Sequence, residues 1–297
     1  MKTLLTKTFL TVVATVIVVT VICFVACDII EEPYRKEIIA PPPDDTKPKI
    51  LLEKFTGHQC INCPEATRLA TQIESLDPEN FITVSIHWGW NARTNSTGKY
   101  SYDFRTTVGN DLGGSSYGLQ GVPNGVINRT RYNGDLVLGP GHWAGAVSSF
   151  RENNTVAEVK IELAANYNST TRQISAEVLL NYLAPQTLTN RVSVWILEDS
   201  IINWQTDRTA TPSDVENYVH NDVLRHSFNG GGLNGSGTGD IVSDTVIPNN
   251  FTFTRIYNFT LPPENDWKPK NLKIVAFVYD DENGVLQAER VKVTVVE

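Results

Sequence analysis

Residues 53–70 have the sequence EKFTGHQCINCPEATRLA, in which Cys60 and Cys63 are separated by two residues. The apolar run PKILLEKFTG (48–57) precedes the cysteines, carries turn signals at both ends and predicts a buried strand. After Cys63, apolar residues recur at helical spacing, and Pro64 suits the first turn of a helix, where its missing N–H costs nothing. The sequence therefore predicts that both cysteines lie at a strand-to-helix turn.

This cysteine pair has three interpretations: a working dithiol, part of a metal site, or a structural disulfide. The N-terminus of a helix favours negative charge, so it would stabilise the thiolate of an exposed Cys60 and lower its pKa. A metal site would need further ligands, with His58 or His87 as the candidates. The chain has five histidines, but no second Cys-x-x-Cys pair and no closely spaced pair of histidines, so we expect no bound metal.

The first 26 residues have the pattern of a secretory signal peptide. Lys2 and Lys7 flank the start of an apolar stretch (8–26) that ends in small residues before Cys27. Ala26 followed by cysteine is typical of a bacterial lipoprotein, in which Cys27 would become the lipidated first residue. The alternative is a single membrane-spanning anchor, since 19 apolar residues are long enough to cross a bilayer.

Residues 27–47 predict an extended tether, because three consecutive prolines and alternating charges cannot build a core. We therefore expect the chain to be attached to a membrane through its N-terminal lipid, outside the cytosol, where Cys60 and Cys63 can form a disulfide. The formal charge of −8 and the lack of a basic stripe argue against a nucleic-acid partner.

Strand-like and helix-like patterns alternate from residue 81 to residue 153. They predict, in order, a strand (81–89), a polar loop (90–102), a short helix (103–114), a strand led by Val122 and Pro123, its hairpin partner (134–140) and a helix (142–153). With the strand and helix around the cysteines, this order resembles that of a thioredoxin-like domain covering residues 48–153. The resemblance implies a cis peptide bond between Val122 and Pro123 that faces the cysteines.

Two residues near the cysteines depart from the thioredoxin pattern. Gln59 stands where thioredoxins have tryptophan, and Lys54 stands where they bury an acid that moves protons at the second thiol. Glu53 is adjacent, but strand alternation points it to the opposite face. His58 has two interpretations: it tunes the Cys60 thiolate, or it makes one backbone contact in the turn.

The second half, residues 154–297, alternates apolar and polar residues without helical spacing. The expected strands lie at 157–168, 172–183, 190–199, 249–261 and 272–296, the last with a hairpin turn at Asn283–Gly284. Short strands separated by Gly, Pro and Asn clusters indicate an all-β, Ig-like antiparallel sandwich. Segment 212–227 fits a short helix or a bent strand, and GGGLNG (230–235) indicates a surface loop rather than a nucleotide site. His220 and His226 are expected to have packing or turn roles.

Four segments together resemble the twenty-eight-kilodalton outer-membrane protein (Omp)-related family of Bacteroidetes: LLEKFTGHQCINCPEA, GVPNGVINR, VHNDVLRHSFNG and LKIVAFVYDDENGVLQAERV. The resemblance covers nearly the whole chain after the signal peptide. It implies an outer-membrane lipoprotein of the cell envelope with a thioredoxin-like domain joined to an Ig-like domain.

Two functions are compatible with this architecture. In the first, the protein exchanges thiols and disulfides with an exported protein: Cys60 attacks, Cys63 resolves the mixed disulfide, and Val122 and Pro123 present a backbone edge to the partner chain, while His58 tunes Cys60. In the second, the protein is a surface binding or adhesion module, and the disulfide is permanent. Neither hypothesis requires a cofactor.

Overall fold

The structure is a computed structural model that describes residues 47–230, 239–243 and 245–297. The predicted signal peptide, Cys27, all but the last residue of the predicted tether and most of the GGGLNG segment lie outside the described residues. Within the described ranges, no helix combines the length and the apolar character needed to cross a membrane.

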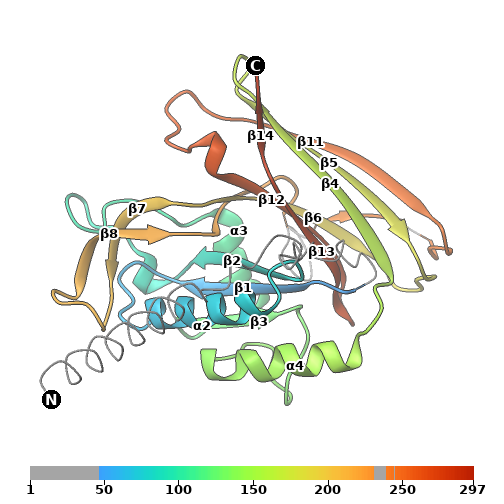
Figure 1. The fold of residues 1–297 in the computed structure, drawn as a ribbon, viewed down its shortest axis with the longest axis horizontal. Helices are drawn as coiled ribbons and strands as arrows, with labels where there is room; N and C mark the ends of the chain where they lie inside the picture. Colours follow the sequence, from blue (N-terminus) through green and yellow to red (C-terminus); the bar gives the residue numbers. More distant parts are fainter. Residues whose placement is uncertain (1–46, 231–238, 244) are drawn as a thin grey trace, which may run out of the picture. The chain divides into compact units, whose positions relative to one another are not determined.

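The cysteine segment connects the first strand to the first described helix. Strand β1 (Ile50–Thr56) leads into α2 (Cys63–Leu76), and β2 (Phe81–His87) then pairs with β1 in parallel. Strand β3 (Asn124–Ile127) pairs with β1 in antiparallel orientation on its other edge. The predicted strand, helix, strand and Pro123-led strand are thus confirmed (Figure 1).

Short helices fill the rest of the first half: η1 (Trp90–Ala92), α3 (Thr107–Asp111), the π-helical turn η2 (Leu112–Ser116), η3 (Pro140–His142) and α4 (Trp143–Asn153). The predicted strand at 134–140 is wrong. The segment forms two isolated bridges, Leu138 with Gly125 through two backbone hydrogen bonds of 2.8 Å and Asp135 with Tyr132. The apolar run is bounded by glycines and ends at Pro140, so it is too short to align further pairs.

The second half is built from strands: β4 (Val159–Asn168), β5 (Gln173–Tyr182), β6 (Arg191–Glu198), β7 (Ile201–Thr206), β8 (Asp214–His220), β9 (Val223–Ser227), β10 (Asp240–Ile241), β11 (Thr252–Thr260), β12 (Leu272–Asp280), β13 (Gly284–Lys292) and β14 (Thr294–Val296), with the 3₁₀ turn η4 (Pro269–Asn271) before β12. Segment 212–227 therefore forms strands rather than a helix. The molecule is a mixed α/β protein whose α-helices lie in the first half and whose second half is rich in β-strands (Figure 1).

Strands from both halves share one long sheet. Its order is β13-β12-β6-β9-β2-β1-β3, with β10 paired to β6, while β11-β5-β4-β14 form a second sheet and β7 and β8 form a hairpin. The halves join where β2 and β9 run in parallel through a single pair, Ser85 and Val223. The predicted boundary at residue 154 follows the end of α4, and the strands before and after it belong to the same sheet.

The two faces of strand β12 pack in two different hydrophobic cores. Its sequence, LKIVAFVYD, is buried at every position. Ile274 and Val278 pack in a core with the four-stranded sheet, whereas Val275 and Phe277 pack in a core with the first half. A strand covered on both faces needs a continuous apolar run, and β12 has one.

The β12–β13 hairpin differs from the predicted two-residue turn at Asn283–Gly284. Its loop spans 281–283, and Gly284 pairs with Asp280 as the first residue of β13. The buried Asp280 carboxylate accepts hydrogen bonds from the backbone N–H groups of Glu282 and Asn283, which stabilises the longer loop. Gly284 has a φ of +77°, so its conformation favours glycine.

Alternation along β1 separates two environments. Ile50 and Leu52 pack in a core with α2 and α4, whereas Leu51 and Phe55 pack in the core on the opposite face. Lys54 continues the first series and Glu53 continues the second. The strand therefore places two consecutive charged residues on opposite faces of the sheet.

Candidate functional site

Cys60 and Cys63 form a disulfide at the start of α2, as the sequence permits. The backbone N–H of Cys60 donates to Gly57 O (3.0 Å) and that of Cys63 donates to Cys60 O (3.3 Å), so a tight turn joins β1 to the helix. Pro64 lies in the first helical turn, as predicted. The pair is therefore held against the positive end of α2.

The loop before β3 reaches the same disulfide. The Val122–Pro123 peptide bond is cis, which confirms the prediction. Cys60 Sγ lies 3.8 Å from the carbonyl oxygen of Val122. The structure therefore brings together four of the predicted site residues: Cys60, Cys63, Val122 and Pro123.

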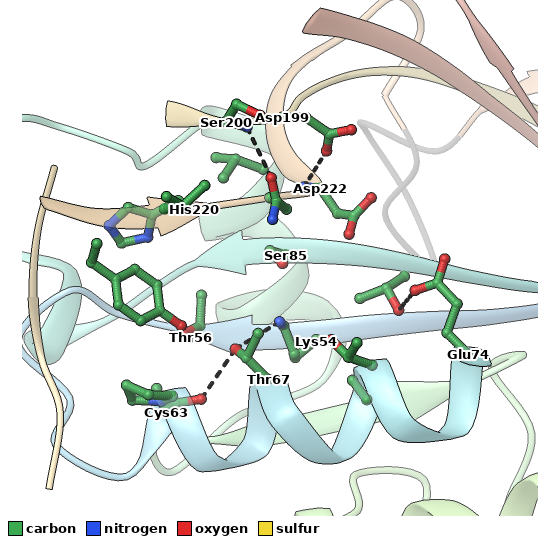
Figure 2. A pocket seen from close by; sticks show the side chains of 18 of the residues that line it. Lys54, Thr56, Cys63, Thr67, Glu74, Ser85, Asp199, Ser200, His220 and Asp222 are labelled. Atoms are coloured by element: carbon green, nitrogen blue, oxygen red, sulfur yellow. Dashed lines mark hydrogen bonds between the residues drawn. The ribbon is translucent and has the colours of Figure 1, made fainter. Parts of the chain in front are cut away.

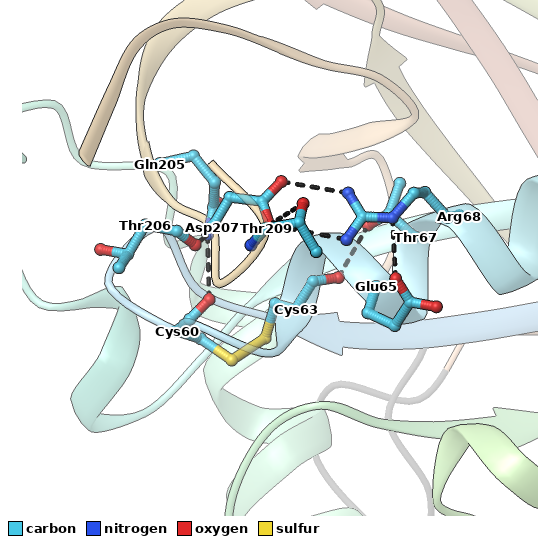
Figure 3. A network of polar contacts seen from close by, with 9 residues as sticks. All are labelled: Cys60, Cys63, Glu65, Thr67, Arg68, Gln205, Thr206, Asp207 and Thr209. Atoms are coloured by element: carbon cyan, nitrogen blue, oxygen red, sulfur yellow. Dashed lines mark hydrogen bonds and ion pairs between the residues drawn. A yellow bond between two sulfur atoms is a disulfide. The ribbon is translucent and has the colours of Figure 1, made fainter. Parts of the chain in front are cut away.

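The hairpin of β7 and β8 covers the cysteine turn, which the sequence did not predict. Thr206 N donates to His58 O (2.8 Å), and Arg208 N donates to Ile61 O (3.1 Å). The side-chain amide of Gln205 donates to Cys60 O at 3.1 Å (Figure 3). It also donates to Gly57 O at 3.3 Å. We call the segment Gln205–Arg208 the clamp.

An ion pair fixes the clamp to α2. Asp207 accepts from Arg68 Nη1 at 3.0 Å, and Arg68 also bonds Glu65 in the first turn of the helix (Figure 3). Beneath the clamp, Cys60 is 3 % exposed and Cys63 is 2 % exposed. The prediction of an exposed Cys60 is therefore wrong, because a segment about 145 residues further along the chain lies over it.

The loop after β2 supports the turn from the other side. Gln59 N donates to Asn91 O at 2.9 Å, and Gln59 Nε2 donates to Arg93 O at 2.7 Å. A Cβ on Gly57 would lie 2.5 Å from Asn91 backbone atoms, so only glycine allows this approach. Gln59 thus anchors the turn at the position where the thioredoxin pattern has tryptophan. The same loop carries Trp90, which is 75 % exposed.

His58 makes a backbone contact and does not bond Cys60. Its Nε2 lies 2.8 Å from Arg93 O, and its Nδ1 has no partner among the described residues. Burial lowers the pKa of His58, so the ring is neutral at pH 7 and does not supply a positive charge. The geometry matches the interpretation of His58 as a turn residue with one backbone contact.

Glu53 lies on the face away from α2, as strand alternation predicts. Its carboxylate pairs with Arg129 at 2.7 Å, both side chains being 1 % exposed, and it accepts a 2.6 Å hydrogen bond from Tyr117. Burial and the nearby carboxylate of Glu53 raise the pKa of Tyr117 well above its ordinary value, so its hydroxyl stays protonated and donates. Because its carboxylate is held by these two contacts on the opposite face of the sheet, Glu53 cannot move protons at the cysteines.

Lys54 lies on the α2 face and borders a polar pocket of about 460 Å³ (Figure 2). The pocket also touches Cys63 and the β8–β9 turn. Its lining comprises Lys54, Thr56, Cys63, Pro64, Thr67, Ala70, Thr71, Glu74, Thr83, Ser85, His87, Asp199, Ser200, Gln205, Tyr218, Val219, His220, Asn221, Asp222, Val223, Lys273, Arg290 and Lys292. About half of these residues follow residue 153, and no local pattern predicts that they would gather beside the disulfide.

Buried polar atoms in the pocket wall lack partners within the described part of the chain. They are Ser85 Oγ, both ring nitrogens of His87 and His220 Nε2. Burial lowers the pKa of His87 well below its ordinary value and that of His220 to about 4, so both rings are neutral at pH 7. Because buried polar groups normally have a hydrogen-bond partner, these atoms are the places in the pocket wall where water or a polar ligand could bond.

The histidines do not build a metal centre. No group of three His, Cys, Asp or Glu residues is placed to hold a metal ion within the described ranges. His87 stacks on Phe104 with ring centroids 4.4 Å apart, and His226 stacks on Phe259 at 4.0 Å. His220 packs against Phe104 and Tyr218. The packing roles expected for His220 and His226 are confirmed.

The fold and the site define a mixed α/β protein with a disulfide at the start of a helix. The sequence model of the family "Outer membrane protein Omp28" matches residues 112–296, which is more than half of the chain. The chain belongs to the Omp28 family, which confirms the predicted family. Membership of this family of outer membrane proteins also confirms the predicted location in the outer membrane of the cell envelope.

Two solved structures from Porphyromonas gingivalis are similar to the chain. HBP35 is 16 % identical, with a TM-score of 0.60 over 84 % of this chain and 76 % of that one, so it shares the fold. A domain of the outer membrane lipoprotein Omp28 is 24 % identical over 48 % of this chain and 92 % of that one, with a TM-score of 0.30. Among curated proteins, none matches the sequence.

Proposed function

We propose that the protein is an outer-membrane lipoprotein, tethered by a lipid on Cys27, that exchanges its Cys60–Cys63 disulfide with thiols of exported proteins. The observation that carries the proposal is the position of the disulfide. It lies at the N-terminus of α2, with Cys60 Sγ 3.8 Å from the backbone carbonyl of Val122. A thiolate is stabilised at such a helix end, and a neighbouring free backbone edge can hold a partner chain.

The order of elements supports a thioredoxin-like domain over residues 48–153. Parallel β1 and β2 are joined by α2, β3 is antiparallel to β1, and α2 and α4 share a core on one face. The packing of β4, β5 and β11 against β6 and β12 supports an Ig-like sandwich in the second half. The clamp comes from the same half of the chain, on the separate hairpin of β7 and β8.

The exchange reaction starts from the disulfide. A thiolate of the partner attacks Cys60 Sγ, the bond between Cys60 and Cys63 breaks, and Cys63 Sγ takes the electron pair and a proton. The second partner thiolate then attacks the partner sulfur of the mixed disulfide and releases Cys60 as a thiolate. The partner loses two electrons and gains a disulfide, and the protein gains two thiols.

Two cysteine variants test the proposal. In full chains that also carry Cys23→Ser and Cys27→Ser, Cys63→Ser leaves Cys60 as the attacking thiol, and Cys60→Ser leaves only Cys63. We expect Cys63→Ser to trap a mixed disulfide with an unfolded polypeptide that contains a disulfide, and Cys60→Ser to trap at least about tenfold less. Equal trapping by both variants, or trapping by neither, would contradict the proposal.

A second candidate function is a surface binding module with a permanent disulfide. The clamp favours it, since Cys60 and Cys63 are almost fully buried under Gln205–Arg208. In that case the disulfide stabilises the turn and does no chemistry. The two candidate functions require different reduction potentials. A permanent disulfide has the lower potential, because it resists reduction by glutathione.

A further inference from the structure

Lys54 differs from the other buried cations around the pocket because no carboxylate of the described residues forms an ion pair with it. Lys273 pairs with Asp199 at 2.8 Å and with Asp222, and Arg290 pairs with Glu74 at 3.0 Å. Lys54 is 4 % exposed and forms no ion pair within the described part of the chain. Its ammonium donates to Thr67 Oγ1 at 2.9 Å (Figure 2).

An isolated buried ammonium releases its proton more easily than one in water. Burial lowers the pKa of Lys54 to about 8, although the negative charges of Asp222 and Glu74 oppose the shift. From β2 and β8 it faces His87 and His220, which are neutral at pH 7. Further around the pocket, the other charged groups are the paired Asp199, Lys273 and Arg290, together with the exposed Lys292.

Thr67 connects Lys54 to the second cysteine. Its hydroxyl accepts from Lys54 Nζ and donates to the backbone oxygen of Cys63 at 3.2 Å. Lys54 and Cys63 also border the same pocket. The ammonium of Lys54 and the residue that takes up the electron pair when the disulfide opens therefore line one pocket and are linked, through Thr67, to the backbone of Cys63.

Other titratable groups near the cysteines are unsuited to this proton. Glu53 lies on the opposite face in its ion pair with Arg129, and His58 is bonded to Arg93 O. His220 titrates at about pH 4, so it is neutral in the range where thiols react. Burial brings the pKa of Lys54 to about 8, close to the pH at which a thiol ionises.

We propose that Lys54 carries the proton that Cys63 Sγ gains when the disulfide opens and loses when it closes. The proposal rests on the exchange reaction proposed above. In opening, the bond between Cys60 and Cys63 breaks, the electron pair moves to Cys63 Sγ, and the Lys54 ammonium supplies the proton. In closing, the neutral amine takes the proton from the Cys63 thiol, which then attacks Cys60.

Two substitutions at Lys54 distinguish proton transfer to Cys63 from stabilisation of the Cys63 thiolate by a positive charge. Lys54→Met keeps the length of the side chain and removes both the charge and the proton. Lys54→Arg keeps a positive charge that does not titrate at accessible pH, so it can stabilise a thiolate but cannot donate a proton to it. Thr83→Val is the matched control, because Thr83 borders the same pocket and is buried beside Glu74.

The test measures how fast an unfolded dithiol polypeptide opens the disulfide, in full chains carrying Cys23→Ser and Cys27→Ser, across the pH range from neutral to alkaline. The ratio of the wild-type rate to each variant rate removes the titration of the attacking thiol. We expect ratios of at least about tenfold at pH 7 for Lys54→Met and for Lys54→Arg, and a ratio near one for Thr83→Val. The first two ratios should fall as pH rises through about 8, where Lys54 loses its proton.

Each other outcome overturns the proposal in a distinguishable way. A Lys54→Met ratio near one at all pH values, in a chain that opens normally, removes Lys54 from the reaction and leaves the exchange function intact. A Lys54→Arg chain as fast as wild type below pH 8 shows that charge alone matters. A wild-type chain that does not exchange contradicts the exchange function and this proposal together. Circular dichroism of each variant confirms that the rates compare folded chains.

Discussion

Glu53 and Lys54 are neighbours on β1, yet they lie in opposite environments. Glu53 forms an ion pair with Arg129 and accepts a hydrogen bond from Tyr117, so its negative charge is compensated within the core. Lys54 faces a pocket and lacks a carboxylate partner within the described residues. Removing one partner of a buried ion pair strongly destabilises a fold, whereas a buried charge that has no partner is itself unfavourable and is available for chemistry.

The largest expected effect on stability comes from breaking the ion pair between Glu53 and Arg129. Arg129→Met leaves the Glu53 carboxylate buried without its partner, and we expect it to lower the free energy of unfolding by about 3–5 kcal/mol. Urea denaturation measures the change. Arg105→Met is the control: it breaks the exposed Arg105–Asp103 pair and should cost less than about 1 kcal/mol. Equal losses in the two variants would show that the Glu53 pair is not a structural centre.

Substitution of Lys54 should change the free energy of unfolding in the opposite direction. Because burial lowers the pKa of Lys54 from 10.5 to about 8, the folded chain binds this proton less tightly than the unfolded chain does. The resulting penalty is fully present below about pH 8 and disappears above the unfolded value of 10.5. Lys54→Met should therefore stabilise the chain by about 1–3 kcal/mol at pH 7.

Urea titrations at pH 7 and above pH 8 check this sign. The advantage of Lys54→Met over wild type should shrink steadily as pH rises through the window between the two pKa values. A variant that is less stable than wild type at pH 7 would mean that Lys54 is compensated after all, and that the contrast with Glu53 is incorrect.

Weakening the clamp should have a smaller effect, on the rate at which a small thiol reduces the disulfide. Gln205→Met removes the two hydrogen bonds that hold Cys60 O and Gly57 O, and we expect a small thiol to reduce the disulfide about 5–30-fold faster. Ile202→Thr, an exposed position in the same hairpin, should leave the rate unchanged. If both variants react at the wild-type rate, the clamp does not control access to the disulfide.

Local pattern sufficed for β1, α2 and the turn between them, because a strand, a proline in the first helical turn and helical spacing act over neighbouring residues. It also placed Glu53 and Lys54 on opposite faces. It could not reveal the clamp or the pocket, since long-range pairing alone brings Gln205 to the cysteine turn, Asp207 to α2 and Asp222 to the pocket. The joining of the two halves was also hidden: we expected alternating strands throughout residues 154–297, whereas β12 is buried on both faces.

The reduction potential of the Cys60–Cys63 pair tests the central claim most directly. The full chain, carrying Cys23→Ser and Cys27→Ser, is equilibrated with glutathione buffers of known ratio, and the fraction of disulfide is measured at each. A disulfide that exchanges should have a potential between about −270 and −120 mV, the range of thiol–disulfide oxidoreductases. A potential below about −300 mV would contradict exchange and identify the disulfide as a permanent structural bond.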